Sequence, residues 1–162
     1  MNFILVNKDN INELANLAKD IWFEYWQTTL SISQIYYMVN KFQSEISLYD
    51  QIVNANFQYY FIQENGENIG YFGFKIYDDY LKLYQFYLKK DFRNRNFGNK
   101  TFLKIKTFCK QNNLNKIQLK IAKQNIKSHK IFEYWGFKFV NSLITRIGNG
   151  YTLEEFVMEY IL

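Results

Sequence analysis

The sequence predicts a mixed α/β fold, with a central, mostly antiparallel twisted sheet of about seven strands flanked by helices. Short segments with alternating apolar residues are separated by segments in which apolar residues recur at helical spacing. An antiparallel run of strands leads into a strand–helix–strand unit. The chain has 162 residues, is 48% hydrophobic and contains no proline, so one compact domain over residues 1–162 is expected.

The N-terminal part is interpreted as a short strand, at residues 3–6, followed by a long helix. Asn10 and Glu13 have the spacing of a capping box, in which two side chains satisfy backbone N–H groups at a helix start. Apolar residues at helical spacing then continue to Tyr25. The sequence therefore predicts that a helix begins directly after Asn10.

Two further helices and a hairpin are expected next. Ser33 is expected to cap a second helix, and Ser44 a third one that ends near Val53. The dipeptide Asn65-Gly66 predicts a tight hairpin, because a type I′ turn needs positive φ at both central residues. The expected hairpin strands are residues 57–62 and 69–77.

The second half alternates strands with two helices. Phe102, Ile105 and Cys109 share one stripe of a helix, so Cys109 is expected to be a core residue. Gly136 is a residue at which helices often end. The expected elements are strands at 81–88, 117–121, 137–147 and 151–160, and helices at 98–112 and 125–135.

The charges are distributed unevenly along the chain. Residues 89–130 hold thirteen basic residues and one acid, whereas residues 1–88 hold five basic and ten acidic residues. A solvated helix face explains part of the basic excess, and a polyphosphate ligand explains why the excess starts near residue 89. Binding to nucleic acid is disfavoured, because the aromatic residues have the spacing of a core rather than of a basic surface.

A short basic segment between a strand and a helix is typical of an anion site. Arg93 and Arg95 lie between the expected strand at 81–88 and the expected helix at 98–112. The first N–H groups of a helix have no internal partner and carry partial positive charge, which suits phosphate oxygens. An ordinary strand-to-helix turn with solvated arginines is the alternative.

Two motifs carry a resemblance to a known family. The first is the turn Arg93-Asn94-Arg95-Asn96-Phe97-Gly98, and the second combines Asn125, Ser128, Phe132 and Gly136-Phe137. Their order and spacing resemble the pyrophosphate turn and the following motif of the GNAT superfamily of acyl-CoA-dependent N-acetyltransferases. The resemblance covers essentially the whole chain. Its end, residues 147–159, is similar to a bacterial subgroup whose substrate is unassigned.

Two residues depart from the family pattern. Asn96 stands where the family has its first glycine, and asparagine is the other residue that best tolerates left-handed φ. Phe132 stands where the family usually has the tyrosine that protonates the leaving thiolate. Tyr134 does not replace it, because two residues along a helix lie on opposite faces. The general acid is left open, and Phe132 is interpreted as a packing residue against the cofactor.

The resemblance implies acetyl-CoA as cosubstrate and direct transfer of its acetyl group to a primary amine in a ternary complex. Leu88 would supply the catalytic backbone N–H that stabilises negative charge on the acetyl oxygen. The implied cofactor-binding residues are Phe86, Leu88, Arg93, Asn94, Arg95, Asn96, Phe97, Gly98, Asn99, Lys100, Asn125 and Phe132.

The acceptor site is predicted less directly. The fourth strand lacks the glutamate that many family members have there, so Glu24, or Glu154 or Glu155 acting through water, are the candidate bases. The acidic character of residues 1–88 suggests a small cationic acceptor, polyamine-like or amino-acid-like. The expected substrate-contacting residues are Tyr25, Trp26, Tyr36 and Tyr37.

Several other expectations follow from composition. His129, the single histidine, has no cysteine or acid at ligand spacing, so no metal is expected, and a solvated helix position is preferred over a catalytic role. One cysteine and no long apolar segment predict a cytoplasmic protein without a membrane span. Either a monomer or a homodimer is compatible. A non-catalytic acetyl-CoA or CoA sensor and a protein N-acetyltransferase are the alternative functions.

Overall fold

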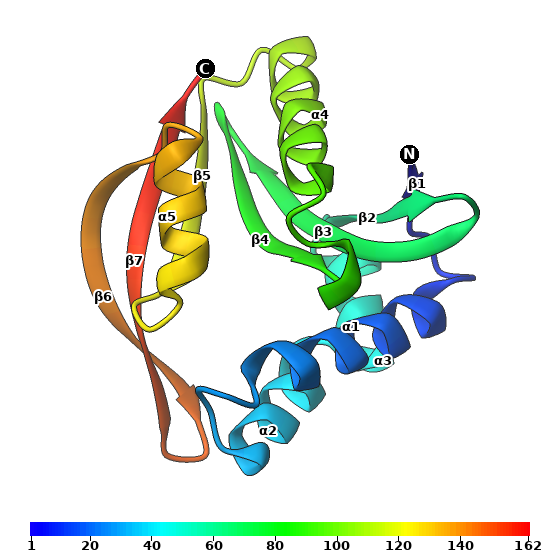
Figure 1. The fold of residues 1–162 in the computed structure, drawn as a ribbon, viewed down its shortest axis with the longest axis vertical. Coiled ribbons are helices and arrows are strands. Elements are labelled where there is room, and N and C mark those ends of the chain that lie inside the picture. The colour runs from blue at the N-terminus through cyan, green and yellow to red at the C-terminus, as the bar shows by residue number, and fades with distance from the viewer. The chain divides into compact units, whose positions relative to one another are not determined.

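Seven strands form a sheet in the order β1-β2-β3-β4-β5-β7-β6 in the computed structural model, which describes all residues 1–162 (Figure 1). Neighbouring strands are antiparallel at β1–β2, β2–β3, β5–β7 and β6–β7, whereas β4 and β5 are parallel. The predicted mixed, mostly antiparallel sheet is confirmed. The strands are β1 Asn2–Leu5, β2 Gln58–Glu64, β3 Glu67–Tyr77, β4 Tyr80–Leu88, β5 Lys116–Ala122, β6 Lys138–Gly148 and β7 Tyr151–Ile161. The α-helices are α1 Ile11–Trp26, α2 Ile32–Phe42, α3 Glu45–Tyr49, α4 Phe97–Gln111 and α5 Ile126–Tyr134.

The chain divides into two compact units, each made of two segments. The first unit comprises residues 1–75 and 85–104, and the second comprises residues 76–84 and 105–162. The boundaries fall inside β3, β4 and α4. The single domain expected from the chain length stays a prediction.

In the first unit, both faces of β3 carry buried aromatic residues. Tyr71 is fully buried, and its hydroxyl accepts a hydrogen bond from Trp22 Nε1 at 2.8 Å and donates one to Gln43 Oε1 at 3.2 Å. The next residue, Phe72, stacks on Tyr60 with ring centroids 5.2 Å apart. Successive strand residues point to opposite faces. The face that carries Tyr71 therefore packs against α1 and the end of α2.

The predicted capping box at the start of α1 is wrong. Asn10 has φ −119° and ψ 16°, outside the extended conformation that helix caps favour. Its Oδ1 accepts a hydrogen bond from the N–H of Asn7 at 2.9 Å, away from the helix. Glu13 accepts one from Asn68 Nδ2 of β3 at 2.6 Å. A tertiary contact has replaced the local one that the sequence pattern suggests.

The second helix is capped two residues earlier than predicted. Ser31 has extended backbone, and its Oγ accepts a hydrogen bond from the N–H three residues on at 3.2 Å, so Ser33 lies inside α2. Ser44 caps α3 in the same way at 3.3 Å, as predicted. The α-helix ends at Tyr49 rather than near residue 53, because Asp50–Asn54 continues as one π-helical turn.

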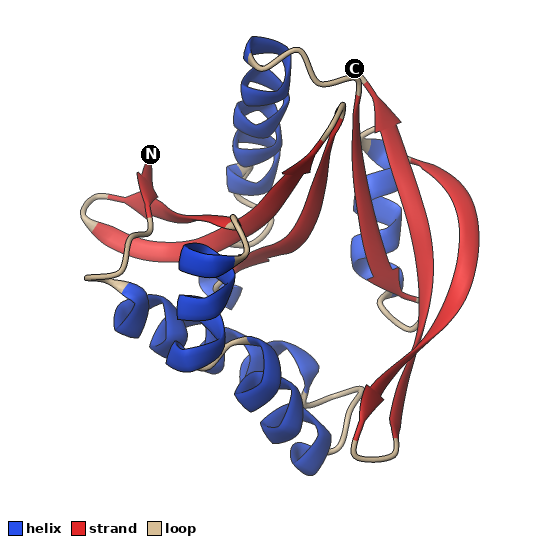
Figure 2. Ribbon diagram, turned by 180° about the vertical axis from the view of Figure 1, so that it is seen from behind, coloured by secondary structure: helices blue, strands red, loops and turns tan.

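In the second unit, β5 separates an apolar face from a polar one. Ile117 and Leu119 are buried, while Gln118 between them donates a hydrogen bond to Glu159 of β7 at 2.8 Å. Helix α5 lies alongside this part of the sheet in Figures 1 and 2. Cys109 of α4 is fully buried, which confirms that it is a core residue.

The predicted turns adopt the conformations that their sequences require. Asn65 and Gly66 both have positive φ, at 50° and 81°, as a type I′ hairpin turn demands. Gly136 has φ 98° directly after α5, where a left-handed residue ends a helix. Gly148, Asn149 and Gly150 also have positive φ, at 93°, 51° and 78°. No helix combines the length and apolar character that crossing a membrane requires.

Candidate active site

The segment that joins β4 to α4 turns twice through the left-handed conformation. Asn94 has φ 59° and Asn96 has φ 65°. Asparagine adopts this conformation more readily than other residues with a side chain, because its short amide causes little steric conflict. The left-handed conformation that the sequence requires of Asn96 is therefore present.

The start of α4 has the electrostatic character of an anion site. At its start Lys100 N donates a backbone hydrogen bond to Asn96 O at 3.2 Å, so the N–H groups of Phe97, Gly98 and Asn99 precede the helical ladder. No acidic residue occupies the first turn, so nothing there neutralises the positive end of the helix dipole. The backbone of this turn suits a phosphate group.

Aromatic rings hold two cations beside this turn. The Arg95 guanidinium carbon lies 5.3 Å from the ring centroid of Phe92 and 5.6 Å from that of Phe97. Lys100 Nζ lies 5.8 Å from the Phe97 centroid. Both separations allow cation–π attraction. The motif thus keeps Arg95 and Lys100 at the N-terminus of α4.

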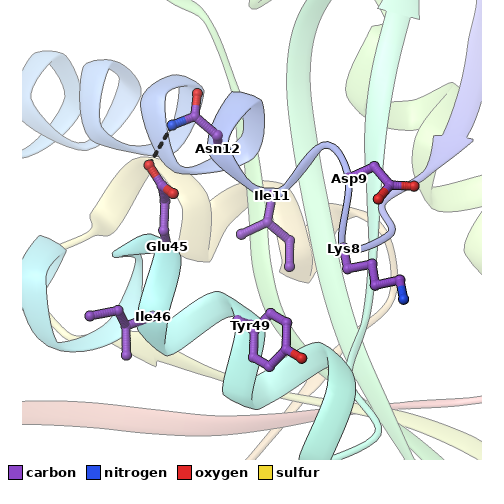
Figure 3. Close-up of a pocket in the computed structure, with 7 residues that line it drawn as sticks. All are labelled: Lys8, Asp9, Ile11, Asn12, Glu45, Ile46 and Tyr49. Atoms are coloured by element: carbon purple, nitrogen blue, oxygen red, sulfur yellow. Dashed lines mark hydrogen bonds between the residues drawn. The ribbon is translucent and has the colours of Figure 1, made fainter.

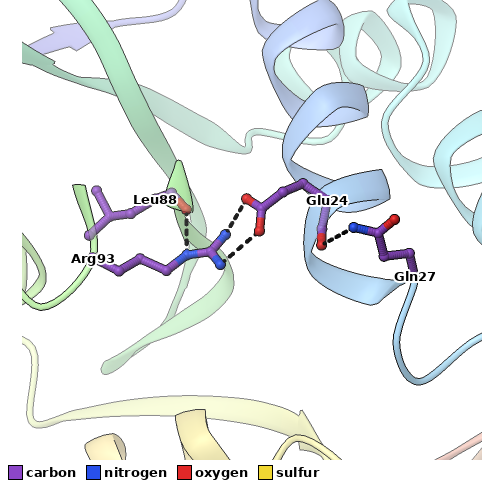
Figure 4. A network of polar contacts seen from close by, with 4 residues as sticks. All are labelled: Glu24, Gln27, Leu88 and Arg93. Carbon is purple, nitrogen blue, oxygen red and sulfur yellow. Dashed lines mark hydrogen bonds and ion pairs between the residues drawn. The ribbon is translucent and has the colours of Figure 1, made fainter. Parts of the chain in front are cut away.

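Arg93 makes a different set of contacts (Figure 4). Its Nε donates a hydrogen bond to the carbonyl oxygen of Leu88 at 2.9 Å. Its two terminal nitrogens donate to the two carboxylate oxygens of Glu24 on α1, at 3.0 and 2.8 Å. The guanidinium carbon also lies 4.9 Å from the ring centroid of Tyr25. The sequence predicts different roles for Glu24 and Arg93, and no local signal pairs residues that are 69 positions apart.

The end of β4 lies unusually close to β3 at Gly70. A Cβ atom at this position would lie 2.3 Å from the carbonyl oxygen of Tyr87 and 3.0 Å from the Cα of Leu88. The next residue pair is hydrogen bonded, from Lys89 N to Ile69 O at 2.8 Å. Only glycine leaves room for this approach. The role of Gly70 is not predictable from the sequence, since an isolated glycine in a strand indicates a close approach but not the partner.

Tyr25 and Trp26 form an aromatic cluster with β4. The Tyr25 ring contacts those of Trp26 and Tyr87 edge to face, at centroid distances of 5.1 and 5.7 Å. Tyr87 also contacts Trp22 at 5.7 Å, and burial raises the pKa of its phenol, because the charged form is poorly solvated there. Trp26 is only 7% exposed. Through Tyr25, this aromatic cluster packs against the guanidinium group of Arg93.

The other predicted acceptor residues lie on α2. Tyr36 is exposed and contacts Phe23 of α1, with ring centroids 4.7 Å apart. Tyr37 is half-buried, and its hydroxyl accepts a hydrogen bond from Lys41 at 3.4 Å. Phe86, which is expected to bind the cofactor rather than the acceptor, lies on β4 and is half-buried. Both tyrosines remain candidate acceptor residues on an accessible helix face.

A comparison with protein-family models decides the family. The model described as Acetyltransferase (GNAT) family matches residues 11–137, well over half of the chain. The chain belongs to the GNAT acetyltransferase family. No curated protein matches it.

Solved structures share the fold of this GNAT protein at low sequence identity. The PaiA N-acetyltransferase of Thermoplasma acidophilum, in complex with coenzyme A, has a TM-score of 0.82 at 18% identity, with both chains fully covered. A chimera of the spermidine N-acetyltransferase SpeG from Vibrio cholerae and hSSAT has a TM-score of 0.69 at 16% identity, with 99% and 96% covered. The ribosomal-protein-alanine N-acetyltransferase of Brucella melitensis has a TM-score of 0.68 at 15% identity, with both chains fully covered.

The second motif of this GNAT protein lies in the second unit. Asn125 caps α5, since its side chain accepts a hydrogen bond from Ser128 N at 3.3 Å. Phe132 is 8% exposed and contacts Phe137 edge to face at 5.3 Å, whereas Tyr134 is 88% exposed. The opposite burial of residues 132 and 134 confirms that they lie on opposite faces of α5.

The remaining polar candidates of the second unit each contact another polar side chain. Glu154 lies 3.0 Å from Lys123 Nζ, and Glu155 accepts a hydrogen bond from Thr145 at 2.6 Å. His129 Nδ1 lies 3.5 Å from a carboxylate oxygen of Glu133. The structure brings together no group of three histidine, cysteine or acidic side chains that could hold a metal ion.

A hollow of about 360 Å³ lies at the opposite end of α1 from Glu24 (Figure 3). Twelve residues separate Asn12 from Glu24, which corresponds to roughly 18 Å along a helix. None of the predicted site residues lines it. Its lining residues are Lys8, Asp9, Ile11, Asn12, Glu45, Ile46 and Tyr49.

Proposed function

We propose that this protein transfers the acetyl group of acetyl-CoA to a primary amine of a small cationic acceptor, by direct attack in a ternary complex. The observation that carries the proposal is the turn before α4, with Asn96 at φ 65° and no acid in the first helical turn. It occurs in a chain of the GNAT family. Acetyl-CoA would supply an activated thioester and a pyrophosphate for this turn.

The residues of the first unit have separable tasks in this proposal. The backbone N–H groups at the start of α4, with Arg95 and Lys100, hold the pyrophosphate. The N–H at Leu88 donates toward the acetyl oxygen, where negative charge develops during transfer. The acceptor amine must lose a proton before attack, since an alkylamine has a pKa near ~10.4. Glu24 of this unit and Glu154 of the second unit stay candidate bases, and both form ion pairs.

The cationic acceptor is supported by charge. Residues 1–88 contain ten acids and five basic residues. Asp20 is exposed on α1, one turn before Glu24, where it adds negative potential to the helix that carries Tyr25. Asp20→Asn should raise the KM for spermidine about two- to fivefold and leave the KM for a monoamine nearly unchanged. Glu133→Gln, in the second unit, is the matched control. Equal changes for both amines in D20N would contradict a cationic acceptor.

The proposal is tested by binding and turnover together. Calorimetric titration with acetyl-CoA, coenzyme A and ATP measures whether the turn binds the cofactor. A thiol-release assay over an amine panel, including spermidine, single amino acids and a peptide with N-terminal alanine, measures transfer. Tight acetyl-CoA binding with turnover on one small amine supports the proposal. Turnover on the peptide alone would make the protein a protein N-acetyltransferase.

One observation favours a second function, a non-catalytic sensor of acetyl-CoA. Phe132 is buried where the family usually has a proton-donating tyrosine, so the motif supplies no hydroxyl for the leaving thiolate. Tight binding of acetyl-CoA without turnover on any amine would support the sensor. Phe132→Tyr would then be informative, because a gain of turnover would show that only the acid is missing.

A further inference from the structure

We propose that Glu24 and Arg93 form a clamp that positions Leu88, and that the Arg93 side chain is a positioning group rather than a ligand of the pyrophosphate. The clamp consists of the Glu24 carboxylate, the Arg93 guanidinium and the Leu88 carbonyl oxygen (Figure 4). This inference rests on the proposed function, because the task assigned to Leu88 comes from it.

The hydrogen bonds of Arg93 show where its side chain is committed. A guanidinium has five N–H donors in a fixed plane. Three of them are used inside the clamp, at 2.9, 3.0 and 2.8 Å. The two donors to Glu24 form the bidentate geometry that gives an arginine–carboxylate pair its orientation. Arg93 therefore faces α1 and the end of β4, and most of its donors are occupied.

Leu88 is consequently held from two directions. Arg93 Nε binds its carbonyl oxygen, while Gly70 allows the backbone of β4 to approach β3 closely at the same residue. The Tyr25 ring supports the guanidinium at 4.9 Å. The orientation of the Leu88 peptide fixes the direction in which neighbouring backbone groups point. Through the clamp, the position of Glu24 on α1 thus fixes the orientation of the backbone at the end of β4.

Arg95 is the matched contrast within the same turn. Its guanidinium lies over Phe92 and Phe97 at the start of α4, and it donates a long hydrogen bond of 3.4 Å to the carbonyl oxygen of Asp91. The Glu64 carboxylate interacts with it electrostatically but forms its ion pair with the N-terminal amine of Met1 instead. The two arginines of the motif therefore have different tasks. Arg95 faces the pyrophosphate, and Arg93 holds the end of β4.

The test compares binding of coenzyme A with turnover in four variants. Glu24→Gln removes the charge of the clamp and keeps its size, while Arg93→Lys keeps the charge and loses the planar fork. Because Glu24 is also a candidate base, a loss of kcat in E24Q supports the clamp only together with the same loss in R93K, which keeps the carboxylate. Both should lower kcat about 10- to 100-fold, since a small misplacement of a catalytic group has effects of this size, and change the Kd of coenzyme A by less than about threefold. Arg95→Gln should instead weaken coenzyme A binding about tenfold.

Glu67→Gln is the control for loss of a salt bridge. Glu67 pairs at 2.8 Å with Lys89, the residue after Leu88, and this ion pair lies outside the clamp. The E67Q variant should keep the wild-type kcat and the wild-type Kd of coenzyme A. Hydrogen exchange of residues 85–92 adds a reading that needs no turnover. It should increase in E24Q and R93K and stay unchanged in E67Q.

Three results would overturn the clamp. They are wild-type kcat in E24Q, a loss of coenzyme A affinity in R93K as large as in R95Q, or unchanged exchange of residues 85–92 in both clamp variants. Failure of the proposed function is recognised separately. In that case the wild-type protein transfers acetyl groups to no amine, and the exchange measurement still decides whether the clamp holds β4.

Discussion

Replacing Gly70 with alanine should disturb the end of β4 more than any other single methyl group. The added Cβ would lie 2.3 Å from the Tyr87 carbonyl oxygen, 2.9 Å from Leu88 Cδ2 and 3.0 Å from Leu88 Cα. Two of these atoms belong to the backbone, so relief requires that β4 moves away by about 1 Å. Overpacking of this kind costs about 1–3 kcal/mol, part of which is offset by the lower chain entropy of unfolded alanine.

The displacement should also reduce activity, because Leu88 is the proposed donor to the acetyl oxygen. A misplacement of about 1 Å lowers turnover on the order of 100-fold. Thermal unfolding should show a Tm lower by about 2–10 °C, since ~1 kcal/mol corresponds to ~2–4 °C in a chain of this size. The Kd of coenzyme A should change little, because the turn before α4 is left intact.

Gly73→Ala separates stability from catalysis. Its Cβ would lie 2.4 Å from the buried Tyr59 ring, on the same strand but away from Leu88. We expect G73A to lose stability as G70A does and to keep most of its kcat below the unfolding temperature. Wild-type Tm and kcat in G70A, or an equal loss of kcat in both variants, would refute the reasoning.

Three further predictions concern the turn, the thiol and acid stability. Asn96→Val should weaken coenzyme A binding by about tenfold, because a β-branched residue is strained at φ 65° by roughly 1–3 kcal/mol, and calorimetry should find Asn96→Gly close to wild type. Burial raises the pKa of Cys109 to about 12, so this thiol should not react with a thiol reagent at about pH 8 unless the protein is unfolded; rapid labelling of native protein would contradict its burial. Hydrogen bonds from Lys116 and Gln118 lower the pKa of Glu159 below its ordinary 4.5, so the pair stabilises the fold above this pH and loses that contribution as pH falls. Urea unfolding from about pH 6 to pH 3 should therefore show a smaller decline in Glu159→Gln than in the wild type, and parallel declines would contradict the pairing.

The fold was predictable because its signals are local. Alternating and helical apolar spacing located all seven strands, and Asn65-Gly66 fixed the hairpin through the backbone of two residues. The errors arose where a tertiary contact competes with a local one. Glu13 has the spacing of a capping box, but it accepts a hydrogen bond from Asn68, 55 residues away. Ser31 and Ser33 are both plausible caps, and the choice between them depends on how the preceding loop leaves α1.

The site was predictable to the extent that it is a motif. The turn from Arg93 to Gly98 is continuous in sequence, and asparagine at position 96 indicated its backbone conformation. Gly70 and Glu24 act on the same strand end from distant positions in the sequence. Their importance depends on which backbone or side chain lies opposite, and a single sequence does not contain that information.

Arg93 and Arg95 illustrate this limit within one turn. Both are cations of the same type, two positions apart, and the sequence assigned both to the phosphate. The structure separates them through their partners, since a carboxylate from α1 binds Arg93 in a bidentate pair and two aromatic rings hold Arg95. An arginine in a bidentate pair with a carboxylate contributes less attraction to an anion than one that forms no ion pair. The charge that a motif presents is therefore set by the elements that pack against it. Here α1 neutralises Arg93, and the clamp that we propose leaves Arg95 to the ligand.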